Sequence, residues 1–163
     1  FEGIRPHLPA KVFALLDIGC GMAGIDVFLW QHCSRPLIYL MDGAGLGELR
    51  YGYHPKVDCY TEPLKALALL EANEVDLMYV KWYYPDPGLT LPVDLILSLL
   101  SCGFHYPVDT YAGLIDRSLR KGGRVILDVR KGENRNLPGF CEVGEIGSYE
   151  KHHRIVYARA GEA

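Results

Sequence analysis

The feature that most constrains the fold is an apolar run that leads directly into a glycine-rich turn. Residues 12–16 are all apolar, as expected of a strand that is buried on both faces. Asp17 follows, and Gly19, Gly21 and Gly24 then match the spacing G-x-G-x-x-G. A strand, a glycine turn and a helix in this order predict a ligand at the carboxyl edge of a parallel sheet.

Short apolar runs alternate with helix-like segments along the rest of the chain, which is typical of a parallel α/β sheet. Further strands are predicted at residues 37–41, 75–80, 93–97 and 124–129. Two more strand-like runs, near residues 140–143 and at 155–158, have no helix between them. The sequence therefore predicts a doubly wound, mostly parallel seven-stranded sheet with helices on both faces and an antiparallel C-terminal hairpin.

Capping residues predict where the connecting helices begin and end. Thr61 is expected to cap a helix that follows a long surface connection over residues 43–59. Asp109 is expected to cap a later helix that turns Ile115 and Leu119 inward and ends at Gly122. With 163 residues, of which 49% are hydrophobic and 23% charged, the chain is expected to form a single domain, residues 1–163.

Charge, cysteine content and the length of the apolar runs argue against nucleic-acid binding, disulfide bonds and membrane association. The formal net charge of −3 argues against broad electrostatic binding of nucleic acid, although basic residues crowd residues 117–135. A solvated helix end followed by a loop explains that stretch more simply. The odd count of five cysteines favours free thiols and a cytoplasmic location, and no metal site is expected. No apolar run approaches the roughly 20 residues that span a bilayer, so no membrane association is predicted.

Two aspartates discriminate between the cofactors that a glycine loop can bind. Asp17 ends the first predicted strand, where its carboxylate can attract the ammonium of an aminoacyl group but would repel a pyrophosphate. Asp42 ends the second strand, where a carboxylate can accept both hydroxyls of a ribose. Asp42 would serve a nicotinamide cofactor equally well, whereas Asp17 favours a cofactor that carries a cation. The alternative role for Asp17 is to cap the helix or brace the loop.

Three motifs in the expected order resemble those of class I S-adenosylmethionine-dependent methyltransferases. They are Leu-Asp-Ile-Gly-Cys-Gly at residues 16–21, Val-Asp-Leu-Ile-Leu-Ser at 93–98, and Leu-Arg-Lys-Gly-Gly-Arg-Val-Ile-Leu-Asp at 119–128. The resemblance covers nearly the whole chain, and the terminal hairpin agrees with the reversed last strand of that family. It implies a Rossmann-like methyltransferase with S-adenosylmethionine as its cofactor.

The resemblance also implies which residues hold the cofactor. Asp17, Gly19 and Gly21, with Cys20 between the glycines, would contact its aminoacyl part. Asp42 would contact the ribose. The remaining cofactor residues are those expected after the third strand and at the end of the fourth, Lys81, Trp82 and Ser98. Many members of the family carry an acidic or amide residue where Lys81 stands, so this chain departs from the adenine-binding pattern, and Trp82 is as compatible with packing as with stacking on a purine.

The acceptor is expected beyond the fourth strand, over residues 98–106. His105 is the candidate general base there, because an imidazole can take a proton from a hydroxyl near neutral pH; a packed loop residue is the alternative. The Tyr-Gly-Tyr-His-Pro run at 51–55 and the Cys-Gly-Phe-His-Tyr-Pro run at 102–107 give a looser resemblance to sugar O-methyltransferases. The leading function is therefore methyl transfer to a small-molecule or sugar hydroxyl.

Three other functions remain open at this point. A nicotinamide-dependent oxidoreductase could use the same glycine loop. An RNA or cap methyltransferase could hold phosphates with Arg130, Lys131 and Arg135. A non-catalytic cofactor-binding module is the third, because only about a dozen residues precede the first strand and the acceptor pocket is then open, absent or completed by a second copy of the chain.

Overall fold

The computed structural model describes residues 1–43 and 62–162. Within these ranges seven strands form a single sheet in the order β3-β2-β1-β4-β5-β7-β6. The strands are β1 (Ala14–Ile18), β2 (Leu37–Met41), β3 (Val80–Tyr83), β4 (Val93–Ser98), β5 (Leu119–Arg130), β6 (Phe140–Ser148) and β7 (His152–Arg159). The helices are α1 (Gly24–His32), α2 (Pro63–Ala72) and α3 (Ala112–Ser118), with short 3₁₀ turns η1 (Arg5–His7), η2 (Leu77–Tyr79) and η3 (Val108–Tyr111).

The sheet is parallel from β3 to β5 and antiparallel in its last two strands, as predicted. β1 pairs with both β2 and β4 in parallel, and β5 pairs in parallel with β4. β7 lies antiparallel between β5 and β6. β2 and β3 lie on one side of β1, and β4 and β5 lie on the other, so the order of strand addition reverses at β1. Such a switch point opens a crevice at the carboxyl ends of the strands. The glycine turn follows β1 and therefore lies at this crevice.

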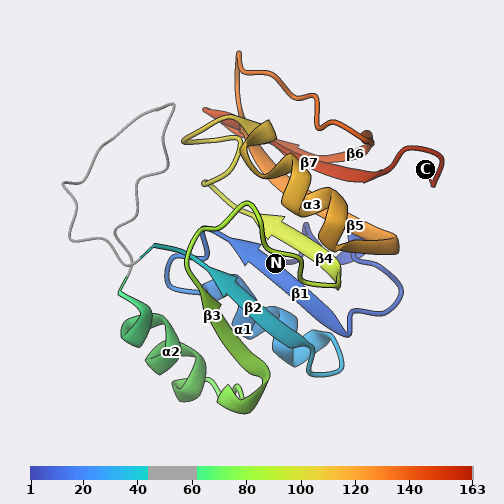
Figure 1. Ribbon diagram of the computed structural model, residues 1–163. Coiled ribbons are helices and arrows are strands. Elements are labelled where there is room, and N and C mark those ends of the chain that lie inside the picture. The colour runs from blue at the N-terminus through green and yellow to red at the C-terminus, as the bar shows by residue number, and fades with distance from the viewer. Residues whose placement is uncertain (44–61, 163) are drawn as a thin grey trace.

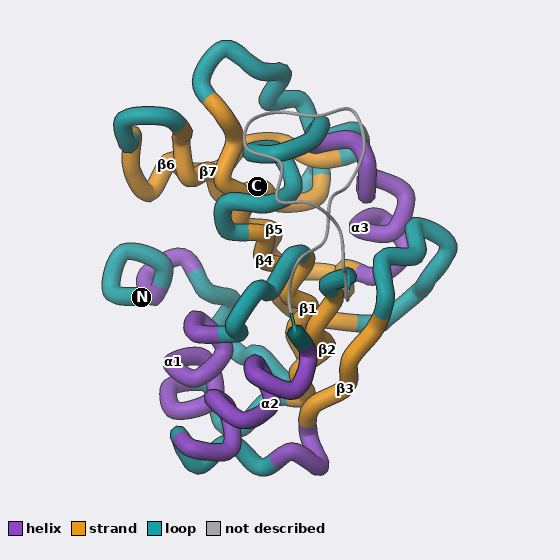
Figure 2. Tube along the Cα trace, turned by 90° about the vertical axis from the view of Figure 1, so that its left-hand side faces the viewer, coloured by secondary structure: helices purple, strands orange, loops and turns teal. Residues whose placement is uncertain are grey.

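Helices cover both faces of the sheet, as predicted (Figure 1). α1 and α2 pack on one face, where Leu29, Trp30 and Leu70 join Leu15 and Ile38 of the strands. η3 and α3 pack on the other face against a second apolar cluster. Figure 2 shows the strands running between these two layers. The two layers bury both faces of β1, which explains why all five of its residues are buried.

β1 begins two residues later than the apolar run predicted. Pairing with β2 begins at Ala14, and the carboxylate of Asp94 accepts hydrogen bonds from the backbone N–H groups of Phe13 (2.8 Å) and Ala14 (3.0 Å). Val12 is buried but lies outside the ladder. The shift places Asp17 inside β1, where the sheet hydrogen bonds fix its backbone and both faces of the strand are buried.

The predicted third strand at residues 75–80 is wrong, because a turn occupies most of it. The carboxylate of Asp76 accepts a hydrogen bond from the Met78 N–H at 3.0 Å and caps η2. Side-chain capping of this kind favours a turn over an extended strand. β3 follows at Val80–Tyr83, so Lys81 and Trp82 lie within the strand and not after it.

The paired glycines do not end a helix, which corrects a second prediction. α3 ends at Ser118, and Leu119 is already the first residue of β5. Gly122 has a φ of +76°, and a Cβ at Gly123 would lie 2.7 Å from the carbonyl oxygen of Asp94. Gly123 is therefore needed where β5 passes close to β4. The expected cap at Thr61 lies outside the described residues, and the proline-led helix α2 begins at Pro63.

Candidate functional site

The glycine turn is held in a conformation that favours glycine at two positions. Gly19 has a φ of +71° and Gly21 a φ of +53°. The Gly19 N–H donates to the carbonyl oxygen of Met41 at 2.7 Å, which ties the turn to the end of β2. A Cβ at Gly19 would lie 1.9 Å from the Oγ of Ser101. Gly19 therefore lets the loop after β4 pack directly against the glycine turn.

Asp42 fixes the second half of the turn. Its Oδ2 accepts a hydrogen bond from the Gly21 N–H at 2.8 Å, although 21 positions separate the two residues. No described atom lies within 4 Å of a Cβ built on Gly21, so this part of the turn faces open space. The structure thus places Asp42 beside an accessible stretch of backbone.

Asp17 lies at the base of the same crevice in a strongly acidic environment. Burial raises its pKa to about 7, a hydrogen bond from Asp26 opposes this, and the charge of Asp42 adds to it. Asp26 comes from the first turn of α1 and is completely buried. Burial and the neighbouring Asp17 raise the Asp26 pKa well above its ordinary value. Asp42 is thus the neighbour that adds negative charge beside Asp17, and a cationic ligand would offset that charge.

Cys20 turns its side chain into the core. It is buried among apolar residues such as Val27 and Leu40 on the α1 face. Burial, together with the charges of Asp17, Asp42 and Asp26, raises the pKa of its thiol far above the ordinary value. The thiol therefore stays neutral, and the part of Cys20 that can face a ligand is its backbone.

Ser98, at the end of β4, joins two strands and a loop. Its hydroxyl donates to the carbonyl oxygen of Ile18 at 2.6 Å and accepts from the Cys102 N–H at 2.8 Å. The side chain is fully buried. Ser98 therefore links β1, β4 and the loop after β4. Its hydroxyl, which was expected to contact the cofactor, is buried beneath the crevice.

The loop after β4 brings His105 to the carboxyl edge of the sheet. The His105 N–H donates to the carbonyl oxygen of Ser101 at 2.8 Å, and the Gly103 N–H donates to that of Tyr106 at 2.8 Å. The Ser101 and Tyr106 hydroxyl oxygens lie 2.8 Å apart. Burial raises the Tyr106 pKa well above its ordinary value, so this phenol remains a neutral hydrogen-bonding group. The loop is tightly braced, and His105 is half-buried on it.

The far side of this loop is anchored to the last strands of the sheet. Arg154 on β7 makes a bidentate pair with the buried carboxylate of Asp128 on β5, at 2.7 and 2.8 Å. The same carboxylate accepts the Leu100 N–H at 3.1 Å. The Arg130 guanidinium lies 4.5 Å from the centre of the Phe104 ring and donates to the Phe104 carbonyl oxygen. The loop after β4 is thus positioned by β5 and β7.

Lys81 and Trp82 lie on opposite faces of β3. The ammonium of Lys81 lies 6.0 Å from the centre of the Tyr39 ring. Trp82 packs against the apolar cluster beneath α1 and α2. Because β3 ends at Tyr83, whose carbonyl oxygen accepts the Asp42 N–H at 3.2 Å, the residues nearest the carboxyl edge are Tyr83 and its successor. The structure does not bring Lys81 and Trp82 together with Asp17 and the glycine turn.

The basic residues between positions 117 and 135 form no single patch among the described residues. β5 separates them, with Arg120 at its start and Arg130 at its end. Arg120 pairs with Asp94 at 3.2 Å, and Arg117 donates to backbone carbonyl groups. Arg135 contacts two glutamates of β6. The stretch predicted as a helix end and a loop is a strand that carries its charges to opposite ends of the sheet.

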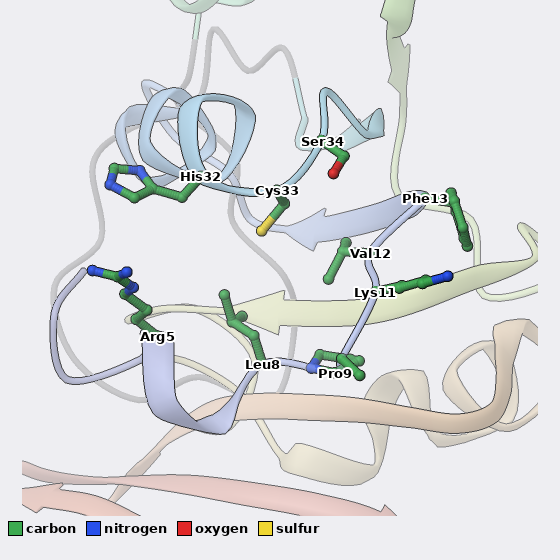
Figure 3. Close-up of a pocket in the computed structure, with 10 residues that line it drawn as sticks. Arg5, Leu8, Pro9, Lys11, Val12, Phe13, His32, Cys33 and Ser34 are labelled. Atoms are coloured by element: carbon green, nitrogen blue, oxygen red, sulfur yellow. The ribbon is translucent and has the colours of Figure 1, made fainter.

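A pocket of about 480 Å³ lies at the other end of the sheet, where β1 and β2 begin. Figure 3 shows Arg5 and His32 on one side of it and Lys11 and Phe13 directed away from them. It lies at the amino ends of the strands, so it is separate from the glycine turn. In the described part of the chain no three His, Cys, Asp or Glu side chains group as a metal site requires, and no helix there is long and apolar enough to cross a bilayer.

Sequence reasoning missed three polar residues of this site. Asp26 lies beside Val27 on the buried side of α1. An aspartate among the apolar residues of a helix is unusual in a sequence, and this signal could have pointed to it. Ser101 and Tyr106 lie in the stretch where the acceptor is expected, but their contacts depend on how the loop folds. Tyr51, Tyr53 and His54 of the Tyr-Gly-Tyr-His-Pro run lie outside the described residues.

Comparison with known proteins identifies the fold. No protein-family model and no curated sequence matches the chain. The solved structures that resemble it include StiE O-MT (TM-score 0.69, 11% identity, 97% of this chain and 71% of that one), the N,N-8-amino-8-demethyl-D-riboflavin dimethyltransferase RosA from Streptomyces davawensis (0.63, 14%, 98% and 51%), and a mutant of MtNAS in complex with S-adenosylmethionine (0.59, 14%, 97% and 58%).

These neighbours and the strand order show that the chain has the Rossmann-like fold of class I methyltransferases. At 11 to 14% identity the likeness concerns the fold alone. The chain spans 51% of RosA and 58% of the MtNAS mutant, so it corresponds to only part of each.

Proposed function

We propose that this protein is an S-adenosylmethionine-dependent methyltransferase that acts on a hydroxyl group of a small molecule or sugar. The observation that carries the proposal is the acidic crevice at the glycine turn, where Asp17 and Asp42 lie at the ends of adjacent strands. S-adenosylmethionine carries an ammonium and a sulfonium group, and both are attracted to such a crevice. The methyltransferase fold of the solved neighbours, one of them in complex with S-adenosylmethionine, supports the same conclusion.

The backbone of the turn suits the donor's contacts. Gly21 faces open space, so a ligand can approach its backbone closely. Asp42 is held beside it by the Gly21 N–H, and a carboxylate is a group that accepts hydrogen bonds from ribose hydroxyls. A nicotinamide cofactor would bring a pyrophosphate to the same turn, where burial and the charge of Asp42 already disfavour negative charge on Asp17. The crevice therefore supports a cationic donor over a dinucleotide.

His105 is the proposed base on the acceptor side. It lies on the loop after β4, which packs against Gly19 through Ser101 and so borders the donor site. Bound S-adenosylmethionine supplies an activated methyl group, and positioning of the acceptor hydroxyl supplies much of the rate. As the acceptor oxygen takes the methyl group, His105 would take the hydroxyl proton.

Calorimetric titration of the protein with S-adenosylhomocysteine and, separately, with NADH tests the donor. We expect the homocysteine compound to bind with a Kd in the micromolar range and NADH to give no measurable heat. Asp42→Ala should weaken the first titration, since it removes the group that fixes the Gly21 N–H. Tight NADH binding without a response to S-adenosylhomocysteine would replace the proposal with an oxidoreductase.

Turnover of His105→Ala tests the base. We expect methyl transfer from S-adenosylmethionine to a panel of hydroxylated sugars and phenols to fall by about 100-fold or more, with little change in donor affinity. His32→Ala is a matched control, because His32 ends α1 at the opposite edge of the sheet and contacts the Phe28 carbonyl oxygen there. Full activity of His105→Ala would remove His105 from the mechanism.

An RNA acceptor is the second candidate that the sequence left open, and the arrangement of basic residues argues against it. Phosphate binding requires several cations along one surface. Of the cations considered for this role, Arg135 is paired with Glu142 and Glu145, and Arg130 lies against the Phe104 ring and donates to its carbonyl oxygen. We expect no binding to a short RNA even at low salt; binding that weakens steeply with added salt would favour the RNA-directed alternative.

The remaining alternative is a cofactor-binding module whose acceptor pocket is supplied by another chain. Met22 in the glycine turn and Leu100 in the loop after β4 each expose 47% of their surface. Exposed apolar side chains beside the crevice suit contact with a small acceptor or with a second copy of the chain. Measuring the mass of the protein by light scattering with and without S-adenosylhomocysteine would show whether a dimer forms when the donor binds.

A further inference from the structure

Two buried carboxyl groups interact beneath the glycine turn. Asp17 lies in β1 and is 2% exposed, and Asp26 lies in the first turn of α1 and is completely buried. No N–H or hydroxyl group of the described residues donates to either carboxyl oxygen of Asp26. The side chain that interacts with Asp26, by charge and by a hydrogen bond between the carboxyl groups, is that of Asp17. Two carboxyl groups can hydrogen-bond to each other only when one of them carries a proton.

The direction of that hydrogen bond can be assigned. Asp26 is the more deeply buried of the two, and both burial and the neighbouring Asp17 keep its proton in place. The contact with Asp26 stabilises the ionised form of Asp17. The start of α1 favours an anion at Asp26, but burial without a donor outweighs that effect. Asp26 is therefore the neutral donor and Asp17 the acceptor.

Two other titratable groups near this pair, in the described part of the chain, stay neutral near neutral pH. Cys20, from the glycine turn, and Tyr106, from the loop after β4, both have raised pKa values and remain neutral. Asp42, at the end of β2, contributes negative charge. β4 contributes the hydroxyl of Ser98, which does not titrate in this range. Asp17 is thus the group of the cluster that changes charge near neutral pH.

We propose that Asp26 is a positioning residue that donates its proton to Asp17, and that binding of the cofactor's ammonium group expels the proton that Asp17 holds in the empty protein. The inference rests on the proposed function and adds to it a coupling between cofactor binding and proton release. An ammonium beside Asp17 stabilises the carboxylate, which lowers the pKa of Asp17 in the complex. Each bound cofactor then releases up to one proton.

The sign of the pH dependence follows from this coupling. In the empty protein Asp17 is mostly protonated below its pKa of about 7. Affinity for a ligand with an ammonium therefore falls as the pH drops below 7, by up to about tenfold per pH unit while a whole proton is displaced. Above about pH 8 Asp17 is already ionised, so affinity is level and no proton is released.

The experiment is calorimetric titration of the full chain with two ligands that share a nucleoside. S-adenosylhomocysteine carries the ammonium, and 5′-methylthioadenosine lacks the amino-acid part; neither carries the sulfonium charge. Each is titrated at about pH 6 and about pH 8 in two buffers that differ in ionisation enthalpy, so that the difference in heat counts the protons released. We expect S-adenosylhomocysteine to release most of one proton at the lower pH and almost none at the higher, and methylthioadenosine to release none at either.

Two substitutions at Asp26 separate donation from charge. Asp26→Asn keeps a neutral donor toward Asp17 and should hold the affinity for S-adenosylhomocysteine within about threefold of the unmodified protein near pH 8. Asp26→Leu removes the donor and should weaken binding by about tenfold or more, with proton release extended to higher pH. Asp17→Asn should abolish proton release.

Three results would overturn the inference. The first is S-adenosylhomocysteine binding near pH 6 without proton exchange, and the second is equal proton release by methylthioadenosine. The third is equal loss of affinity in Asp26→Asn and Asp26→Leu, which would mean that Asp26 acts through a negative charge. In each of these cases the proposed methyltransferase function survives. Failure of S-adenosylhomocysteine to bind at either pH would overturn that function and the inference together.

Discussion

The Oδ2 atom of Asp42 accepts the backbone N–H of Gly21 at 2.8 Å, so the residue after β2 fixes the turn that follows β1. This side-chain bond adds to the backbone bond from the Gly19 N–H to the Met41 carbonyl oxygen, which joins the same two segments. The bond from Gly21 to Asp42 explains how a turn with open space above Gly21 keeps one conformation without side-chain packing at that residue.

Asp42→Ala is expected to loosen the glycine turn and to remove the ribose acceptor at once. We expect affinity for S-adenosylhomocysteine to fall by about 10- to 100-fold, which corresponds to the loss of one or two hydrogen bonds to a charged group. Asp42→Asn keeps an acceptor for the Gly21 N–H and should lose less. Isothermal titration of both variants measures the difference, and equal losses would show that charge alone matters.

Gly19→Ala should damage the protein far more than Gly24→Ala. A Cβ at Gly19 meets the Ser101 side chain at 1.9 Å, and its φ of +71° is strained for alanine, so we expect a loss of about 2–4 kcal/mol in unfolding free energy. Gly24 begins α1 with no atom within 4 Å of a built Cβ, and alanine there should be neutral or slightly stabilising. Urea denaturation compares the two variants; similar losses would contradict the packing of Ser101 on the turn.

Ser98→Ala should destabilise the junction of β1 and β4. It leaves the Ile18 carbonyl oxygen and the Cys102 N–H buried without their partner, at a cost of about 2–4 kcal/mol in unfolding free energy. Ser118→Ala removes one such bond, from the Leu91 N–H, and should cost about half as much. If Ser98→Ala instead kept full stability and lost donor binding, Ser98 would be a direct cofactor contact.

The raised pKa of Asp17 predicts a pH-dependent loss of stability. Folding raises that pKa from 3.8 to about 7, so the folded protein holds a proton that the unfolded chain has already lost. Unfolding free energy should therefore fall as the pH rises from about 4 to about 7 and be level above that. Asn does not titrate, so the unfolding free energy of Asp17→Asn should not show this fall. Its unfolding free energy relative to that of the unmodified protein should therefore increase by a few kcal/mol from about pH 5 to about pH 8.

Urea unfolding of Asp17→Asn at these two pH values measures the gain. Asp86→Asn is the control, because Asp86 lies on an exposed loop, where its carboxylate accepts the Gly88 N–H. The unfolding free energy of Asp86→Asn should change with pH as much as that of the unmodified protein does. If the unfolding free energy of Asp17→Asn also changed with pH by the same amount, Asp17 would not hold a proton in the folded protein.

Periodicity and glycine spacing predicted most of the fold because they report burial directly. β2 is found as predicted at Leu37–Met41, and β4 extends one residue beyond the predicted 93–97. The errors arise where one side chain decides the backbone. Asp76 caps a turn inside an apolar run, and close approach to the Asp94 carbonyl oxygen, which has no sequence pattern, explains Gly123.

The candidate site was predictable where it depends on strand ends and unpredictable where it depends on contacts. Asp17 and Asp42 lie near the carboxyl edge because parallel strands end there, and the sequence marks those ends. The pairing of Asp17 with Asp26 requires the exact rotation of α1 on the sheet, which no local pattern specifies. Lys81 and Trp82 were assigned to the donor site only because β3 was placed too early.

The hydrogen bonds around Asp128 join the C-terminal hairpin to the loop after β4. Arg154 on β7 holds the Asp128 carboxylate, which in turn accepts the Leu100 N–H at the start of that loop. The glycine turn is fixed from β2, through Asp42 and the Met41 carbonyl oxygen. The loop and the turn meet where Ser101 packs against Gly19. Under the proposed function, substitutions in the hairpin should therefore act first on acceptor choice and reach donor affinity through this contact.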